Sequence, residues 1–232
     1  MSHYRLPSHV HICFPDDAAV LLDLVRDKYF GLDPSQVSLL RTALTKGLAP
    51  ETENGILKEL AAEDLLTIGT GEGREVAPTV FEHGTEVLVD IDTESRAGVD
   101  ADIRFSDVVT LVASFIAARY ALQVRCLNYA VQRARRRKLI ANQINPAFDI
   151  EHARNVVRRF LRIRPFLYAA HDRCLLDSLT LLEFLAHYEL FPTWVLGVRT
   201  APFMAHAWVQ HDRFVFNDTP ARTRCYTPIL AV

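Results

Sequence analysis

Short apolar runs separated by polar turns open the chain. Residues 10–14, 19–25 and 29–32 are rich in Val, Ile, Leu, Phe and Tyr, and Pro, Asp, Arg and Lys lie between them. Runs of this length and composition, bounded by turn-forming residues, are typical of β-strands. They predict a small antiparallel sheet at the N-terminus.

The pattern then changes to a helical spacing. Asp33 is followed by Pro34 and, three residues after the Asp, by Gln36. This is a typical helix start, because the Asp and Gln side chains can satisfy backbone amides that have no partner in the first turn. Apolar residues then recur every three or four positions, and again over residues 53–63. Together with the three strands, these helices predict a winged-helix-like module over residues 1–70.

A cluster of glycines follows this module and indicates a linker. Residues 71–104 are therefore interpreted as a linker of uncertain structure. A long helix is then expected from Ser106 or Asp107 to about Arg137, and another over residues 148–161.

A further change of pattern marks the C-terminal part of the chain. Asp172 can cap a helix that runs from Arg173 to about residue 189. Strands are expected over residues 193–198, 203–210 and 214–218. A helix followed by an antiparallel sheet is an α+β layout, so residues 105–232 are predicted to form one α+β domain.

The charge is nearly balanced but unevenly distributed. The 232 residues carry a formal net charge of −2, with −5 over residues 1–80 and +3 over residues 81–232. Such a balance does not suggest a nucleic-acid-binding protein. The basic run at residues 133–138 is either a solvated helix face or a patch for a phosphate, a tRNA or a protein partner.

Cysteine usage and the hydrophobic profile limit the possible chemistry and location. The four cysteines are scattered without a CxxC pair or close His spacing, which argues against a zinc site and a disulfide framework. We expect no metal and no cofactor. The start of the chain does not read as a signal peptide, and the longest apolar run, residues 108–118, is too short to cross a bilayer. These features predict a cytoplasmic protein with free thiols and no membrane partner.

Three residues of the C-terminal part are candidates for nucleophilic catalysis. Cys174 is expected in the first turn of its helix, where unpaired amides and the helix dipole favour a thiolate. His206 lies within a predicted strand, and Asp218 closes the next one. The three fit a nucleophile, its base and the group that orients the base. Taken singly, they also fit a buried inert thiol, a structural histidine and a turn residue.

The hairpin between the last two predicted strands tests this hypothesis. A three-residue loop, residues 211–213, would place Asp218 directly opposite His206, although Arg213 is then a poor residue for the positive φ that such a loop needs. A two-residue loop, residues 211–212, would place Asn217 there instead. We predict the three-residue loop, with Asp218 on the imidazole.

These residues resemble a known family. Residues 105–232 are similar to the transglutaminase-like leader peptidase of lasso peptide biosynthesis, the B2 part of the B protein. The likeness is carried by Arg173-Cys174-Leu175, Gly197-Val198-Arg199, the run from Pro202 to Val209, and Asn217-Asp218. It implies that Cys174 is the nucleophile, His206 the general base and Asp218 its orienter. The chain departs from the family at Arg213, where the family often has Gly.

The N-terminal module is similar to the B1 part, a peptide-recognition module (RRE-like) that is also found with other enzymes that modify ribosomal peptides. In such modules the leader peptide adds a strand to the third strand of the sheet. The resemblance places that edge at Tyr29, Phe30, Gly31 and Leu32. Strand addition to an exposed edge is a common mode of peptide recognition. By alternation, at least one of these side chains belongs to the core instead.

The resemblance implies a fused lasso B protein. Its N-terminal module would hold the leader of a precursor peptide, and Cys174 would cleave at the leader–core junction, freeing the core for macrolactam formation by an ATP-dependent lasso cyclase. Two other functions use the same residues: acyl transfer to an amine, as transglutaminases perform, and non-catalytic binding of the precursor as a chaperone.

Overall fold

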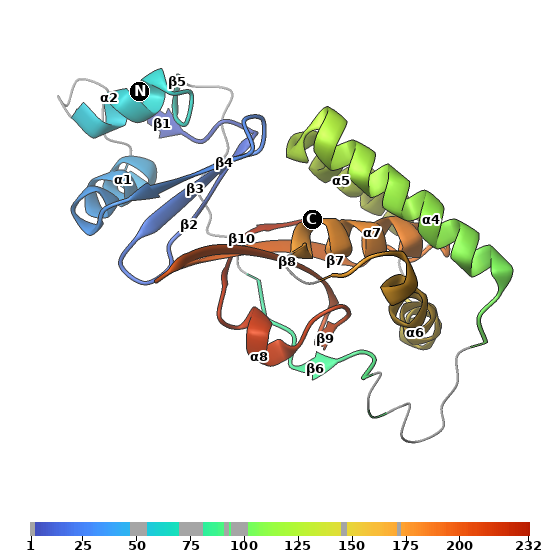
Figure 1. Cartoon of the computed structure of the whole chain (residues 1–232). Helices are drawn as coiled ribbons and strands as arrows, with labels where there is room; N and C mark the ends of the chain where they lie inside the picture. Colours follow the sequence, from blue (N-terminus) through green and yellow to red (C-terminus); the bar gives the residue numbers. More distant parts are fainter. Residues whose placement is uncertain are drawn as a thin grey trace. The chain divides into compact units, whose positions relative to one another are not determined.

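The computed structural model describes residues 3–46, 55–69, 81–90, 93, 102–144, 148–170 and 173–232 (Figure 1). The chain divides into two compact units. One comprises Met1–Val80, Val198–Met204 and Thr227–Leu230, and the other Phe81–Gly197, Ala205–Tyr226 and Ala231–Val232. The division of function between residues 1–70, 71–104 and 105–232 stays a prediction.

A three-stranded antiparallel sheet lies in the N-terminal part, as predicted. Its order is β2 (Val10–Cys13), β3 (Ala19–Asp23) and β4 (Lys28–Leu32). A separate two-stranded sheet pairs β1 (His3–Arg5) with β5 (Thr67–Gly69), which the apolar pattern did not predict.

Two helices cover a core of apolar side chains from these strands. They are α1 (Pro34–Lys46) and α2 (Gly55–Ala62). The backbone N–H of Asp33 donates to Oε1 of Gln36 at 3.1 Å, which is one arm of the predicted capping box. The core includes apolar residues from both sheets and both helices: Tyr4, Leu6, Val10, Ile12, Leu21, Leu32, Leu40, Leu57 and Leu60.

A five-stranded sheet organises the C-terminal part. Its order is β10 (Thr227–Ala231), β7 (Thr193–Thr200), β8 (Phe203–His211), β9 (Phe214–Val215) and β6 (Glu86–Val87). The expected strand over residues 214–218 is shorter than predicted, because only two of its residues join the ladder. Strand β10 was not predicted, and β6 pairs in parallel with β9 across more than 120 positions of sequence.

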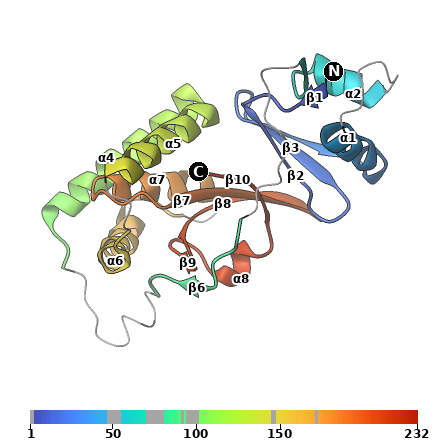
Figure 2. The ribbon, with the colours of Figure 1, turned by 180° about the vertical axis from the view of Figure 1, so that it is seen from behind.

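Helices pack beside this sheet. Helix α4 (Phe105–Tyr120) contacts α6 (Ile150–Leu167) and α7 (Cys174–Ala186), and α7 lies between α4 and the strands in both views (Figure 2). A short α8 (Pro220–Thr223) precedes β10. The mixture of helices with a mainly antiparallel sheet confirms the α+β fold class.

The predicted single helix from residue 106 to 137 is wrong. Helix α4 continues as a π-helical segment, Ala121–Arg125, and Cys126 then breaks the helix with φ 152° before α5 (Leu127–Ile144) begins. Apolar periodicity continues through the break, so the sequence pattern alone did not mark it.

The helical stretch Phe105–Arg125 has a mean hydropathy of 1.4 and is 28% buried. By length and composition alone it is long and apolar enough to cross a membrane. The sequence pattern predicted no stretch of this length, because it counted only the apolar run of residues 108–118. Helix α4 contacts α6 and α7.

Candidate active site

Cys174 begins helix α7 and is partly exposed. Arg173 occupies the cap position, and its side chain makes no capping hydrogen bond. The predicted cap, Asp172, lies outside the described residues. The amides of this first turn and the helix dipole therefore face the thiol, as an anionic sulfur requires.

His206 lies in β8 and is buried, with 5% of its surface exposed. Its ring stacks on Trp208, with centroids 5.9 Å apart, and packs against Tyr226 at 4.9 Å. Gly197 in β7 makes room for this arrangement: a Cβ there would lie 3.0 Å from both the Trp208 ring and Cβ of Tyr226. The close approach explains why a residue without a side chain occupies this strand position.

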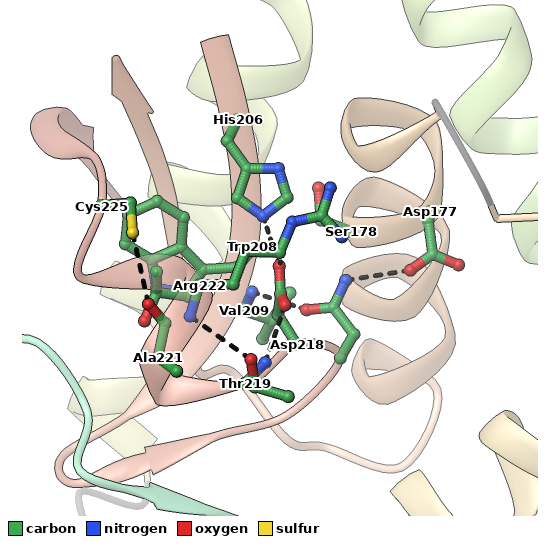
Figure 3. A network of polar contacts seen from close by, with 12 residues as sticks. Asp177, Ser178, His206, Trp208, Val209, Asp218, Thr219, Ala221, Arg222 and Cys225 are labelled. Carbon is green, nitrogen blue, oxygen red and sulfur yellow. Dashed lines mark hydrogen bonds and ion pairs between the residues drawn. The ribbon is translucent and has the colours of Figure 1, made fainter. Parts of the chain in front are cut away.

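Asp218 contacts the imidazole, as predicted. Its Oδ2 is hydrogen-bonded to Nε2 of His206, and its Oδ1 accepts from the backbone N–H of Thr219 at 2.7 Å (Figure 3). With Nε2 engaged by the carboxylate, Nδ1 is the ring nitrogen that remains for the thiol of Cys174.

The predicted hairpin loop is wrong, although the predicted contact exists. In the observed register His211 pairs with Phe214, so the connection is two residues, Asp212 and Arg213. Neither the predicted three-residue loop nor the alternative of residues 211–212 forms. The positive φ of 48° falls on Asp212 and not on Arg213. A short polar residue tolerates this left-handed conformation far better than Arg does.

Asn217 explains how Asp218 reaches His206 in this register. Beyond the bond from the N–H of Phe216 to the carbonyl of Val209, the chain leaves the strand ladder. The side-chain oxygen of Asn217 accepts from the backbone N–H of Val209 at 2.9 Å. Asp218 follows directly, and its carboxylate bonds Nε2 of the His206 ring.

Electrostatics at the site favour an ion pair between thiolate and imidazolium. Burial raises the pKa of the Cys174 thiol, but the hydrogen bond and charge of His206, with smaller contributions from the amides of Ala207 and Leu175, outweigh it and lower the pKa below its ordinary value. Burial acts to lower the pKa of His206, but its bonds to Asp218 and Cys174, and their charges, raise that pKa to about 9. A low thiol pKa beside a high imidazole pKa is the state in which a cysteine is nucleophilic at neutral pH.

One part of the site was not predicted from the sequence. Asp177, one turn after Cys174 in α7, is a buried carboxylate that accepts hydrogen bonds from Arg164, Tyr168 and Asn217. A carboxylate within an apolar helix was the available signal, because such a group is rarely buried without partners.

The basic run at residues 133–138 has internal partners. Arg133 and Arg137 both donate to Oε2 of Glu183, a buried residue of α7, at 3.0 and 2.7 Å. Lys138 donates to the hydroxyl of Thr193 at 2.6 Å. These bonds tie α5 to the rest of its unit, which accounts for three of the charges without an external ligand.

The predicted leader-binding residues lie in β4, far along the chain from the catalytic candidates. Strand β4 is an edge of its sheet among the described residues, because it pairs only with β3. Leu32 is buried in the core, Tyr29 and Phe30 are half-buried, and Gly31 is exposed. The edge thus presents backbone groups with a partly apolar surface beside them.

The described part of the chain has no group of three or more His, Cys, Asp or Glu side chains that could hold a metal ion.

Comparison with curated proteins found no match, and comparison with solved structures also found none. The sequence profile of the transglutaminase-like superfamily matches residues 107–231, a span that includes Cys174, His206 and Asp218. Since this match covers more than half of the 232 residues, the chain belongs to the transglutaminase-like superfamily.

Proposed function

We propose that this protein is a cysteine peptidase that binds the leader of a ribosomally made lasso precursor and cleaves it at the leader–core junction. The observation that carries the proposal is the arrangement of Cys174, His206 and Asp218 in a transglutaminase-like domain. The superfamily supports thiol-based acyl chemistry, and the edge strand β4 supports peptide binding.

Acylation starts from the ion pair. The Cys174 sulfur attacks the scissile carbonyl carbon, and the amides of the first turn of α7 are placed to stabilise the oxyanion that forms. His206 then gives its proton to the leaving amine nitrogen as the C–N bond breaks. The leader stays on the enzyme as a thioester, and the core leaves with a free α-amine.

Deacylation restores the site. A water molecule attacks the thioester carbonyl, and neutral His206 accepts its proton. Collapse of the second tetrahedral intermediate breaks the C–S bond and releases the leader as a carboxylic acid. Throughout the cycle, the Asp218 carboxylate holds the ring orientation and stabilises the imidazolium.

Leader recognition is assigned to residues 28–32 of β4. A leader segment would pair with the free edge as an added strand, and the half-buried Tyr29 and Phe30 would contact its apolar side chains. The released α-amine is the nucleophile for macrolactam formation, so an ATP-dependent lasso cyclase is the proposed partner, with both enzymes acting in the cytoplasm.

Incubation with a precursor peptide, followed by intact mass spectrometry, tests the proposal. We expect two fragments whose masses add up to the precursor plus one water. Fragments that carry an added amine would instead assign acyl transfer. The Cys174→Ala variant is expected to bind the leader as the unaltered protein does and to cleave nothing. Cleavage by this variant would overturn the proposal.

A further inference from the structure

A buried hydrogen bond joins the helix that carries Cys174 to the segment that carries Asp218. Nδ2 of Asn217 donates to Oδ2 of Asp177 at 2.9 Å, and Figure 3 draws a dashed line to the Asp177 carboxylate. Asp177 lies one helical turn after Cys174, the proposed nucleophile. Asn217 directly precedes Asp218, the residue proposed to orient His206.

The Asp177 end of this link is held rigidly. Its carboxylate, with 3% of the residue exposed, also accepts from the hydroxyl of Tyr168 at 3.1 Å and from Nη1 of Arg164 at 3.2 Å. Burial and the Asp177 charge raise the pKa of Tyr168, so its hydroxyl keeps its proton and remains a donor. A carboxylate with three donors and a nearby positive charge has its burial cost compensated.

The Asn217 end is also satisfied. Its side-chain oxygen accepts from the N–H of Val209 in β8, and its amide nitrogen reaches Asp177 in α7. One planar amide therefore connects the strand of His206, the helix of Cys174 and the backbone position next to Asp218. An Asp in place of Asn217 would lack the N–H donor to Asp177. An apolar residue would lack both that donor and the oxygen that accepts from Val209.

We propose that Asn217 and Asp177 are positioning residues that set the distance between the Cys174 sulfur and the His206 ring. The inference rests on the proposed function in one respect, the use of Cys174 as the nucleophile, and it adds the group that aligns the two halves of the ion pair. Loss of the link frees the segment after β9, and the Asp218 carboxylate no longer holds the ring against the sulfur. Misplacement by about 1 Å at such a site costs on the order of 100-fold in rate.

Glu183 provides a matched control. It lies in the same helix as Asp177, it is buried to a similar degree, and it also pairs with arginine side chains. Its partners, Arg133 and Arg137, are in α5, and within the described part of the chain it has no hydrogen bond or ion pair to Cys174, His206 or Asp218. Replacing it perturbs a buried carboxylate of α7 without touching the link.

The experiment measures alkylation of Cys174 by iodoacetamide as a function of pH, read by mass spectrometry of the Cys174 peptide. It needs no substrate. In Asn217→Ala we expect the rate at pH 7 to fall about 10-fold or more, and reactivity to begin at higher pH, because the thiol loses its contact with the imidazolium. Asp177→Asn keeps the side-chain volume and one acceptor oxygen, so its alkylation profile should also move to higher pH, but by less. The profile of Glu183→Gln should match that of the unaltered protein.

The outcomes separate this inference from the proposed function. A folded Asn217→Ala variant with an unaltered profile would overturn the inference, as would an equal shift in Glu183→Gln. If the alanine variant does not fold, an unshifted profile in Asp177→Asn overturns it in the same way. By contrast, a Cys174 that is no more reactive than Cys126 in the unaltered protein would argue against the proposed nucleophile itself.

Discussion

At the scale of single residues, the chemistry depends on two opposed pKa shifts. Against the effect of burial, Asp218 and the Cys174 thiolate raise the pKa of His206. Again against the effect of burial, the imidazolium of His206 lowers the pKa of Cys174. Because each shift is caused in part by the other group, the pair titrates as a unit and exists as an ion pair over a window of pH. The ring orientation that makes this possible depends on Trp208 and Tyr226, which in turn depend on Gly197.

The pH profile of cleavage should therefore be bell-shaped. Activity requires Cys174 deprotonated and His206 protonated, so kcat/KM should rise on an acid limb set by the lowered thiol pKa and fall as pH increases through about 9. Initial rates in buffers of constant ionic strength provide the measurement. In Asp218→Asn the negative charge that raises the His206 pKa is gone, and the alkaline limb should move to lower pH. An alkaline limb that stays in place in this variant contradicts the assignment.

Gly197→Ala tests the packing behind the imidazole. The new Cβ would lie 3.0 Å from atoms of Trp208 and Tyr226, so we expect a loss of about 1–3 kcal/mol in the free energy of unfolding. Urea denaturation provides the measurement. Gly31→Ala is the matched control in another strand, where a Cβ meets nothing within 4 Å, and its effect should be within about 0.5 kcal/mol. Equal losses in the two variants would show that crowding at Gly197 is not the cause.

At the scale of elements, the helix that carries Cys174 and the proposed leader strand are held by different kinds of contact. Helix α7 presents the thiol at its first turn, is bound to α6 through Asp177 and Arg164, and is bound to α5 through Glu183. The Trp194 indole N–H donates to Ser178, which ties the same helix to β7. Strand β4 pairs only with β3 among the described residues, and its Tyr29 ring contacts Phe203, with centroids 5.7 Å apart.

Hydrogen exchange should reveal which strand receives the leader. On addition of a leader peptide, amides of β4 (Lys28–Leu32) are expected to gain protection, since an added strand pairs with its free edge. Strand β2, at the other end of the same sheet, is the internal control and should exchange unchanged. The Cys174→Ala variant prevents cleavage during labelling. Protection at β2 with none at β4 would contradict the proposed leader edge.

At the scale of the whole molecule, the proposed function assigns leader binding and cleavage to separate parts of one chain. A leader held at the N-terminal sheet would have a high effective concentration at the thiol, so the cleavage site itself would need to recognise little sequence. On this proposal, Cys174 can be partly exposed and the proposed leader edge can lie far from it in the chain.

Free leader peptide should consequently act as a competitive inhibitor of precursor cleavage. It occupies β4 but offers no scissile bond, so KM should rise with leader concentration while kcat stays constant. Steady-state rates at several leader concentrations measure this, with a scrambled leader as the control. A fall in kcat at saturating precursor would contradict tethering through a single leader site.

The sequence by itself determined the features that arise from neighbouring residues. The first strands, the Asp33–Gln36 helix start, the thiol at the beginning of α7 and the α+β layout all follow from periodicity and turn chemistry over a few positions. Tertiary structure alone decided the β8–β9 register, the helix break at Cys126 and the bond between Asn217 and Asp177. These depend on which distant groups meet, and neither the cost of burying a carboxylate nor that of a left-handed backbone conformation is recorded in the local pattern.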